Sequence, residues 1–423
     1  MKPAARRDAP AADESHATAQ DVNESGYYQA LDLYTPGLLP APAIPVHPVL
    51  SFASFRGGRV TTPSILDAGD VRLVTSGRIA IAMALQQIGV KQGDEVLLPA
   101  YCCSSMVDPV VWSGLTPVFY KITDDLRIDH RDLRMRLGAK TRAIIAVHFF
   151  GFPQPLERLR ELCDEWNIAL VEDCAHAFFG DWQGQSPGSV GDYAIASPTK
   201  FFPVYDGGCL ASSRHSLSGV DLRRAGIKFP LKSLLNTLER SAQYRRLRPL
   251  SWVLRPLVRA KDWLWTKMKA ASKAPAESIG PPSADGGFDF DPKWLSVAMA
   301  LPSAWLVRRL SHSRIEQMRR NNYRRLADAF SDVSGVTVLF PELDPGVVPY
   351  MFPLLVDQPG RVFPRLKMGA VPIFRWEHVH SDNCPVSVDF ATRLFQLPCH
   401  QEMSDDDIGW LTAKVKAAVA RLG

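Results

Sequence analysis

Residues from about 70 to 215 alternate short apolar runs with helical patterns, and this alternation restricts the fold more than any other feature of the chain. The runs "VRLVTSG", "EVLLPA", "RAIIAVHFFG" and "IALVEDCA" are nearly continuous in apolar residues. Such runs are typical of strands buried on both faces of a mainly parallel sheet. The helical patterns "RIAIAMALQQIG" and "PLERLRELCDEWN" lie between them. Strand–helix–strand repetition predicts an α/β architecture.

The remainder of the chain divides into parts of different character. Residues 1–50 are rich in alanine and proline, which predicts a disordered or extended N-terminal arm. We expect a large α/β domain over 51–215, a basic helical insertion and linker over 216–285, and a smaller α+β domain over 286–423. The last helical pattern begins with acidic residues and ends with cationic ones, as the helix dipole favours.

Composition indicates a soluble globular protein and limits its partners. The 423 residues are 46% hydrophobic and 22% charged, and the net charge of +5 is too small for this length to indicate nucleic-acid binding. The seven cysteines include no CxxC pair, so we expect free thiols in a reducing compartment and no zinc site. Because no signal peptide or membrane-spanning run is visible, we expect a cytoplasmic protein.

The segment 222–273 is strongly basic. It holds 14 Lys and Arg but only two acids, Glu239 and Asp262, with leucines and tryptophans between the cations. Three interpretations remain open: a solvated helical insertion over the active site, a binding site for an anionic substrate such as a nucleotide diphosphate, or a peripheral contact with an acidic membrane surface.

Three short motifs carry the candidate chemistry. In "TSGRIAIAMAL" a strand ends before Ser76 and a helix begins near Arg78, so the free amides of the first turn could hold a phosphate, or Ser76 could be a plain N-cap. In "ALVEDCAHAFFG" Asp173 ends an apolar strand, where ligand sites form in α/β sheets, although it could instead cap a helix.

The third motif, "ASPTKFFPVYDGGCL", contains Lys200, which follows Asp173 by one turn-rich excursion and another strand. We expect the two residues to face each other at one sheet edge. A lysine beside a carboxylate and a phosphate cup suggests pyridoxal 5'-phosphate, because the lysine can bond the aldehyde and the acid can pair with the pyridine nitrogen.

The ordered series SG-x-x-A, GDEV-x-x-PA, VHFFG, VEDCAHAFFG, PTK and DGG resembles the DegT/StrS family of sugar-nucleotide aminotransferases. The resemblance covers about 70–213 closely and resumes more loosely from about 286, where "LPCHQEMSDDDI" resembles a late family motif. It implies a fold-type I pyridoxal-phosphate enzyme with a large sheet domain and a small C-terminal domain. It also implies a homodimer.

The resemblance implies a role for each matching residue. Lys200 would bond the cofactor and later transfer protons. Asp173 would bind the pyridine nitrogen, and His176 would lie near the phenolic oxygen. Ser76, Gly77 and Arg78 would form the phosphate cup, and Ser197 would assist the phosphate or the ring.

The sequence departs from the family pattern at four places. Arg78 stands where threonine is usual, and Ile195 stands where a serine precedes the lysine by five residues. The position of a ring-stacking aromatic aligns with Cys103, and Tyr101 lies two residues earlier. Asp289 aligns with an asparagine that the partner subunit donates to the phosphate.

Other polar clusters have less specific interpretations. Arg375 and Trp376, in "FRWEHVH", are candidate substrate contacts or plain surface. His148 is expected to be a buried structural histidine. Cys399 and His400 are adjacent, but a cysteine–histidine nucleophile requires an activating environment that sequence does not reveal.

The function that these observations predict is transfer of an amino group, from an amino acid such as glutamate, to a keto sugar attached to a nucleotide. Its product would enter polysaccharide or glycoconjugate biosynthesis. One alternative is a dehydratase of the same family, against which Lys200 argues. The other is a non-catalytic scaffold that keeps a degenerate cofactor site, supported by Cys103, Ile195 and Asp289.

Overall fold

The computed structural model describes residues 39–58, 61–247, 290–376 and 384–420, together with the backbone of two short strand segments, 29–30 and 378–379. Asp289, Glu377, the side chain of His378 and the basic segment beyond residue 247 lie outside the described residues.

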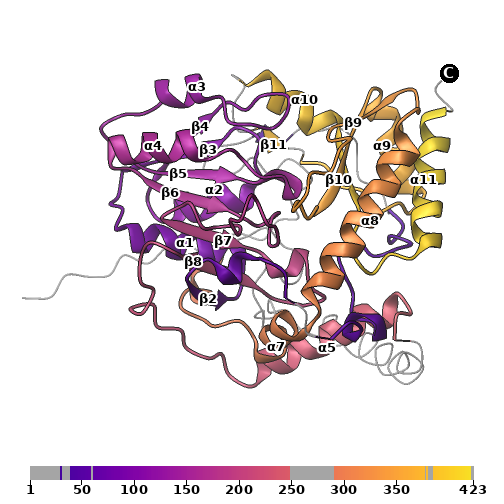
Figure 1. Ribbon diagram of the computed structural model, residues 1–423, viewed down its shortest axis with the longest axis horizontal. Helices are drawn as coiled ribbons and strands as arrows, with labels where there is room; N and C mark the ends of the chain where they lie inside the picture. The colour runs from indigo at the N-terminus through magenta and orange to yellow at the C-terminus, as the bar shows by residue number, and fades with distance from the viewer. Residues whose placement is uncertain are drawn as a thin grey trace, which may run out of the picture.

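A seven-stranded sheet forms the larger part of the molecule (Figure 1). Its strands, in spatial order, are β2 (Asp70–Val74), β8 (Gly208–Ser212), β7 (Tyr193–Ala196), β6 (Ala169–Asp173), β5 (Thr141–Val147), β3 (Glu95–Pro99) and β4 (Thr116–Tyr120). The pairs from β7 to β4 are parallel, and β8 pairs antiparallel with both of its neighbours. The predicted α/β architecture is therefore confirmed.

Four helices connect these strands: α1 (Gly77–Ile88), α2 (Ser104–Trp112), α3 (His130–Met135) and α4 (Glu157–Trp166). The first of them begins at the N-cap Ser76 and ends at Gly89, whose φ of 75° is a left-handed conformation that glycine adopts without strain. Eight consecutive residues of α1, from Arg78 to Leu85, are buried, because this helix packs between α2 and strands β7 and β8.

A smaller unit follows, at the right of Figure 1. Its antiparallel sheet has the order β12 (Leu394–Pro398), β10 (Met351–Val356) and β9 (Val336–Val338). Its helices are α8 (His312–Phe330), α9 (Pro359–Met368), α10 (Pro385–Arg393) and α11 (Asp405–Ala420). A separate hydrophobic core, which includes Phe330, Phe352 and Phe395, fills the space between this sheet and its helices.

Two further helices, α5 (Lys228–Gln243) and α7 (Leu301–Arg309), lie together at the bottom of Figure 1. A two-residue pairing joins β1 (Gln29–Ala30) to β11 (His378–Val379). Short 3-10 helices occur at Phe52–Phe55, Ile65–Asp67, Phe149–Gly151, Pro198–Lys200 and Pro292–Trp294. No helix among the described residues is long and apolar enough to cross a membrane.

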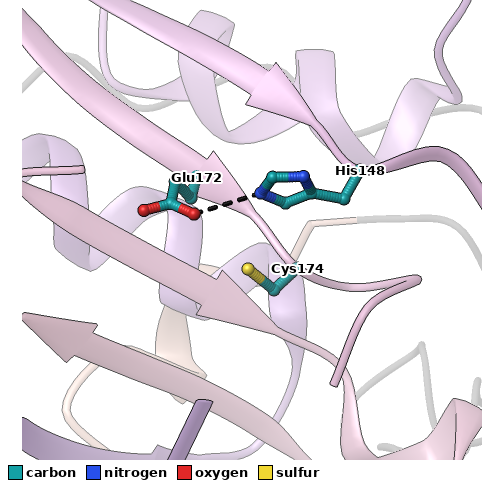
Figure 2. A group of neighbouring side chains, drawn as sticks. All are labelled: His148, Glu172 and Cys174. Carbon is teal, nitrogen blue, oxygen red and sulfur yellow. Dashed lines mark hydrogen bonds and ion pairs between the residues drawn. The ribbon is translucent and has the colours of Figure 1, made fainter. Parts of the chain in front are cut away.

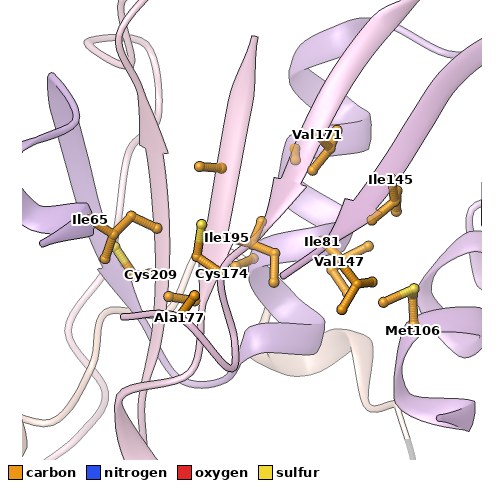
Figure 3. Packing of buried hydrophobic residues seen from close by; sticks show 14 of the residues in the cluster. Ile65, Ile81, Met106, Ile145, Val147, Val171, Cys174, Ala177, Ile195 and Cys209 are labelled. Carbon is orange, nitrogen blue, oxygen red and sulfur yellow. The ribbon is translucent and has the colours of Figure 1, made fainter. Parts of the chain in front are cut away.

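The main core fills the faces of the large sheet and reaches the strand ends. Figure 3 shows Ile195 of β7 packed among apolar side chains that include Ile81 and Val147. Ile195 is 1% exposed. The residue that replaces the expected serine therefore extends the core to the edge of the sheet where the polar groups described below converge.

Candidate active site

A cavity of about 680 Å³ lies where the carboxyl ends of β6 and β7 meet the first turn of α1. The cavity lies at the edge of the sheet where the sequence predicts a site, because parallel strands place their ends at one edge. The lining includes Ser76, Gly77, Arg78, Cys103, Asp173, His176, Ser197, Lys200, Arg375 and Trp376. Of the predicted site residues, Tyr101 alone is not in the lining.

Lys200 ends the short 3-10 helix that follows β7, and its side chain enters the cavity. Its ammonium nitrogen lies 5.3 Å from the centre of the Tyr350 ring. Burial lowers the pKa of Lys200, the nearby Cys103 and Asp173 oppose that effect, and Arg78 adds to it. A lowered pKa enlarges the fraction of neutral amine, which is the nucleophilic form.

Asp173 is the last residue of β6, and it pairs in register with Ile195 on β7. Its Oδ1 accepts a hydrogen bond of 2.8 Å from the Ala175 amide. Burial raises the pKa of Asp173, and the charge of Lys200 opposes this rise. The alternative interpretation, that Asp173 caps a helix, is wrong, because β6 is followed by a turn.

Ser76 and the start of α1 form the opposite end of the polar cluster. The Ser76 Oγ accepts the Ile79 amide at 3.3 Å, so the N-cap interpretation is confirmed, and the same residue lines the cavity. Gly208 makes this approach possible, since a Cβ at that position would lie 2.1 Å from the Ser76 carbonyl oxygen. The remaining first-turn amides and the buried Arg78 favour an anion.

His176 is 4% exposed and its protonation is fixed by its surroundings. Its Nδ1 accepts the Phe150 amide at 3.3 Å, and its ring stacks on Tyr350 with 4.5 Å between centroids. Burial lowers the pKa of His176 well below its ordinary value, and Lys200 adds to the effect. The ring is therefore neutral, with its hydrogen on Nε2 as a donor.

Trp376 lines the cavity and forms an aromatic part of its wall. Its ring lies 5.4 Å from the His176 ring and 4.9 Å from the Tyr101 ring. Tyr101 is fully buried and packs against Trp376 outside the cavity lining. Cys103 is the N-cap residue of α2, and the Ser197 Oγ lies 3.1 Å from the Thr199 hydroxyl.

Arg375 lines the cavity but is engaged by the small domain. Its guanidinium lies 3.8 Å from the centre of the Phe363 ring, and its Nη1 donates to the Thr392 carbonyl at 3.4 Å. Its predicted role as a substrate contact remains a prediction.

Arg319 of α8 is a residue that the sequence did not single out. It is fully buried, and its guanidinium donates to the carbonyls of Pro349, Tyr350 and Lys200 and to the side chain of Gln401. The bond to the Lys200 carbonyl is 2.8 Å long. Arg319 thereby ties the main chain of the candidate nucleophile to the small domain. Because α8 contains several arginines, nothing in its sequence distinguishes Arg319 from the others.

A second group was also missed, because it belongs to no recognisable motif. Residues Pro45–Val49, which precede the large sheet, line the cavity together with three residues from the end of α5: Arg240, Gln243 and Tyr244. The first part of the basic segment thus forms one wall of the site, in agreement with the interpretation that it lies over the active site.

His148, Glu172 and Cys174 form a buried cluster whose ligand atoms lie within 4.8 Å of one another (Figure 2). The His148 Nδ1 accepts the Gln154 amide at 3.0 Å, so its Nε2 hydrogen points to Glu172 at 3.1 Å. Glu172 also accepts three backbone amides, and burial raises the pKa of the Cys174 thiol well above its ordinary value. The cluster is a satisfied hydrogen-bond network, as expected for His148.

Cys399 and His400 do not form a nucleophilic pair. The His400 Nε2 bonds the Pro45 carbonyl at 2.9 Å, and its Nδ1 accepts the Glu402 amide at 3.2 Å. Burial raises the pKa of Cys399 to about 12. Both groups therefore have structural roles at the junction between the small domain and the N-terminal segment.

Known sequences resemble this chain over the region that contains Asp173 and Lys200. Residues 66–220 match the DegT/DnrJ/EryC1/StrS aminotransferase family. The GDP-perosamine synthase of Vibrio cholerae is 35% identical over 125 residues, which are 29% of this chain and 34% of that protein. The UDP-N-acetyl-3-dehydro-alpha-D-glucosamine 3-aminotransferase of Acidithiobacillus ferrooxidans is 32% identical over 129 residues, 30% of this chain and 34% of its own length. The chain thus matches about a third of the length of these curated relatives.

Solved structures share the fold over a larger part of the chain. The aminotransferase TlmJ of Streptoalloteichus hindustanus has a TM-score of 0.61 at 20% identity and covers 91% of this chain and 100% of its own. A DegT DnrJ EryC1 StrS aminotransferase of Brucella abortus has a TM-score of 0.57 at 18% identity, covering 84% and 87%. The predicted family resemblance is confirmed over 66–220, and the predicted fold is confirmed over most of the chain.

Proposed function

We propose, from the family match over residues 66–220, that this chain is a pyridoxal-phosphate-dependent aminotransferase that converts a nucleotide-linked keto sugar into an amino sugar. The observation that carries the proposal is the convergence of Lys200, Asp173 and the first turn of α1 in one cavity. These groups lie on three separate segments that only the sheet brings together.

The chemistry of these groups fits pyridoxal phosphate. An amine of lowered pKa suits the aldehyde, a buried carboxylate suits the pyridine nitrogen, and a helix N-terminus beside Arg78 suits the phosphate. When bound, the cofactor supplies a conjugated ring that withdraws electrons from the carbon bearing the amino group.

The residues of the chain supply the remaining functions. The Lys200 amine, when neutral, can take a proton from a substrate carbon and return it to another position. The Asp173 carboxylate can stabilise positive charge on a ring nitrogen, and the charge of Lys200 favours its ionised form against the burial that raises its pKa. His176 donates from Nε2 while its Nδ1 is held by the Phe150 amide. Tyr350, Phe374 and Trp376 exclude water from this side of the cavity.

The names of the relatives guide the choice of substrates. Both curated relatives described above are named for products or substrates that are nucleotide-linked sugars.

The test is to incubate the cofactor-loaded protein with nitrogen-15-labelled glutamate and a panel of GDP- and UDP-linked keto sugars, and to follow the label by mass spectrometry. Label in an amino sugar supports the proposal, and Lys200→Ala is the control that should form none. Absence of label with every sugar and with labelled glutamine would overturn it.

We further propose that the protein is a cytoplasmic homodimer that contacts an anionic membrane through α5. Ile227 precedes this helix, and Leu231, Leu234 and Leu235 on it are exposed, whereas its buried residues include Ser233, Thr237 and Ser241. Leucines on the outer face beside lysines are typical of helices at a lipid interface.

Deletion of residues 222–273 is a poor test of membrane contact, because it would remove a wall of the cavity. A variant in which all three exposed leucines are replaced by glutamine gives a more specific test, because the residues that line the cavity are unchanged. We expect it to abolish flotation with vesicles containing anionic lipid, and equal flotation would reject the contact. Sedimentation equilibrium of the same two proteins gives the oligomeric state, and a monomeric wild-type protein would reject the homodimer.

A further inference from the structure

Arg240 lies on the wall of the cavity that α5 forms. It is exposed, and its side chain makes no hydrogen bond or ion pair with any residue in the described part of the chain. Arg375, the candidate chosen from the sequence, is by contrast buried against Phe363 and bonded to Thr392. Among the described residues that line the cavity, Arg240 of the basic segment is therefore a cation that a ligand can reach.

The balance of charge in the cavity leaves room for a second anion. Among the described residues, its lining holds four cationic side chains, Arg78, Lys200, Arg240 and Arg375, but a single carboxylate, Asp173. A cofactor phosphate at the start of α1 would occupy the end near Arg78, because helix N-termini hold phosphates. Arg240 belongs to a different element, at the wall formed by α5 and the N-terminal segment.

The neighbours of Arg240 are polar groups suited to an oxyanion. His47 lies between the rings of Tyr350 and Phe374, with centroid separations of 6.1 and 5.9 Å, and its buried Nδ1 has no hydrogen-bond partner among the described residues. Burial, and then the charge of Arg240, lower the pKa of His47 to about 3, so the ring is neutral. Gln243, one turn beyond Arg240, adds an amide to the same lining.

The element that carries Arg240 is fixed at both ends. Near its start, Asp206 accepts hydrogen bonds of 2.9 Å from Ser233 and 2.6 Å from Ser303, which joins α5 to α7. Beyond its end, Arg246 pairs with Asp407 at 2.5 Å. Because sites on fixed elements hold ligands in defined positions, Arg240 is placed to act as a recognition group.

We propose that Arg240, with Gln243 and His47, forms a subsite for an oxyanion of the substrate, and that this oxyanion is the diphosphate of the nucleotide sugar. The inference rests on the proposed function and names the part of the substrate that α5 recognises. A guanidinium binds phosphate oxygens through paired N–H donors, and a cavity of about 680 Å³ is of the size that holds a drug-sized ligand. The carboxylate of the amino donor has the same chemistry and is the competing source.

The test compares three cofactor-loaded proteins by titration calorimetry: wild type, Arg240→Gln and Arg309→Gln. Arg309 is an exposed arginine of α7 outside the cavity lining, so its loss removes the same charge elsewhere. The probes are GDP, UDP and glutamate, each added alone. We expect Arg240→Gln to weaken nucleoside diphosphate binding about tenfold or more, as for loss of a charge-assisted hydrogen bond, and to leave glutamate binding unchanged. Arg309→Gln should match the wild type, and Arg240→Lys should restore part of the loss.

Three results would overturn the proposal: no binding of either nucleotide by the wild type, equal nucleotide affinity in Arg240→Gln, or a loss confined to glutamate. The last would assign the subsite to the donor carboxylate. The absorbance of bound cofactor is recorded for each protein beforehand. A protein that fails to bind pyridoxal phosphate contradicts the proposed function, whereas normal cofactor binding with unchanged nucleotide affinity contradicts only the subsite.

Discussion

The two walls of the cavity differ in what holds their functional groups in place. On the strand-end wall, Asp173 and Lys200 follow adjacent parallel strands, and their pKa values are shifted by burial and by each other. On the opposite wall, Arg240 projects from α5 without a partner among the described residues. The first wall matches a family over 66–220, and the second lies outside that match. Under the two proposals above, the sheet would carry the reaction chemistry and α5 would carry the choice of substrate.

The largest expected effect comes from removing the amine of the strand-end wall. Lys200→Ala should lower turnover by roughly 10³-fold or more, because the covalent and proton-transfer roles disappear together. Steady-state kinetics measures the loss, with Lys228→Ala, an exposed lysine of α5, as the control. Turnover within tenfold of the wild type would place the chemistry elsewhere.

The second effect concerns the carboxylate. Asp173→Asn keeps the acceptor for the Ala175 amide but removes the charge, and it should lower turnover by about 10²- to 10³-fold, as loss of a preorganised electrostatic group does.

Asp173 also raises the pKa of Lys200, so its loss lowers that pKa further and leaves more neutral amine at low pH. Capture of pyridoxal phosphate, followed by absorbance, should therefore extend to lower pH in Asp173→Asn. An unchanged pH profile would show that the two groups are not coupled.

The third prediction tests the tie between the strand-end wall and the small domain. Arg319→Lys keeps a charge but cannot make the four donations of the guanidinium, so unfolding free energy should fall by about 2–4 kcal/mol. Urea denaturation measures it. Gln401→Met, which leaves Arg319 in place and removes one acceptor, should cost about 1–2 kcal/mol. Losses below 0.5 kcal/mol in both variants, about the size of a surface substitution, would refute this tie.

The smallest effect concerns the anchor of α5. Burial acts to raise the pKa of Asp407, but the Ser404 amide and Arg246 outweigh it, and the pKa is lowered overall. The pair therefore stabilises the protein above the unfolded-state pKa near 4, and this contribution is lost as the pH falls through the lowered value. Arg246→Met should cost about 1 kcal/mol at pH 7 and less at pH 3. A cost independent of pH would show that packing, not charge, is lost.

The strand-end wall could be predicted from the sequence because its signals are local. Apolar runs fixed the strands, and Asp173 and the stretch before Lys200 come at the ends of two of them. Parallel pairing then places their groups at one edge. Ser76 could be predicted from its position alone, because it stands immediately before a helical pattern.

The α5 wall could not be predicted, because the pattern of leucines in α5 indicates the wrong buried face. The leucines of α5 would ordinarily indicate its buried face, yet Leu231, Leu234 and Leu235 are exposed, and small hydroxyl residues face the core. Ser233 is buried there because Asp206 accepts its hydroxyl, a contact between distant segments. Arg319 could not be predicted for the same reason, because its partners Pro349, Tyr350 and Gln401 come from distant segments and no sequence period indicates such contacts.

The covalent role of Lys200 is the central claim about this site, and one measurement tests it directly. Purified protein is incubated with pyridoxal phosphate, reduced with borohydride and digested, and the peptides are analysed by mass spectrometry. We expect a reduced phosphopyridoxyl group on the peptide containing Lys200, and none in Lys200→Ala. Modification of another lysine instead, or of no lysine in a protein that remains folded, would contradict it.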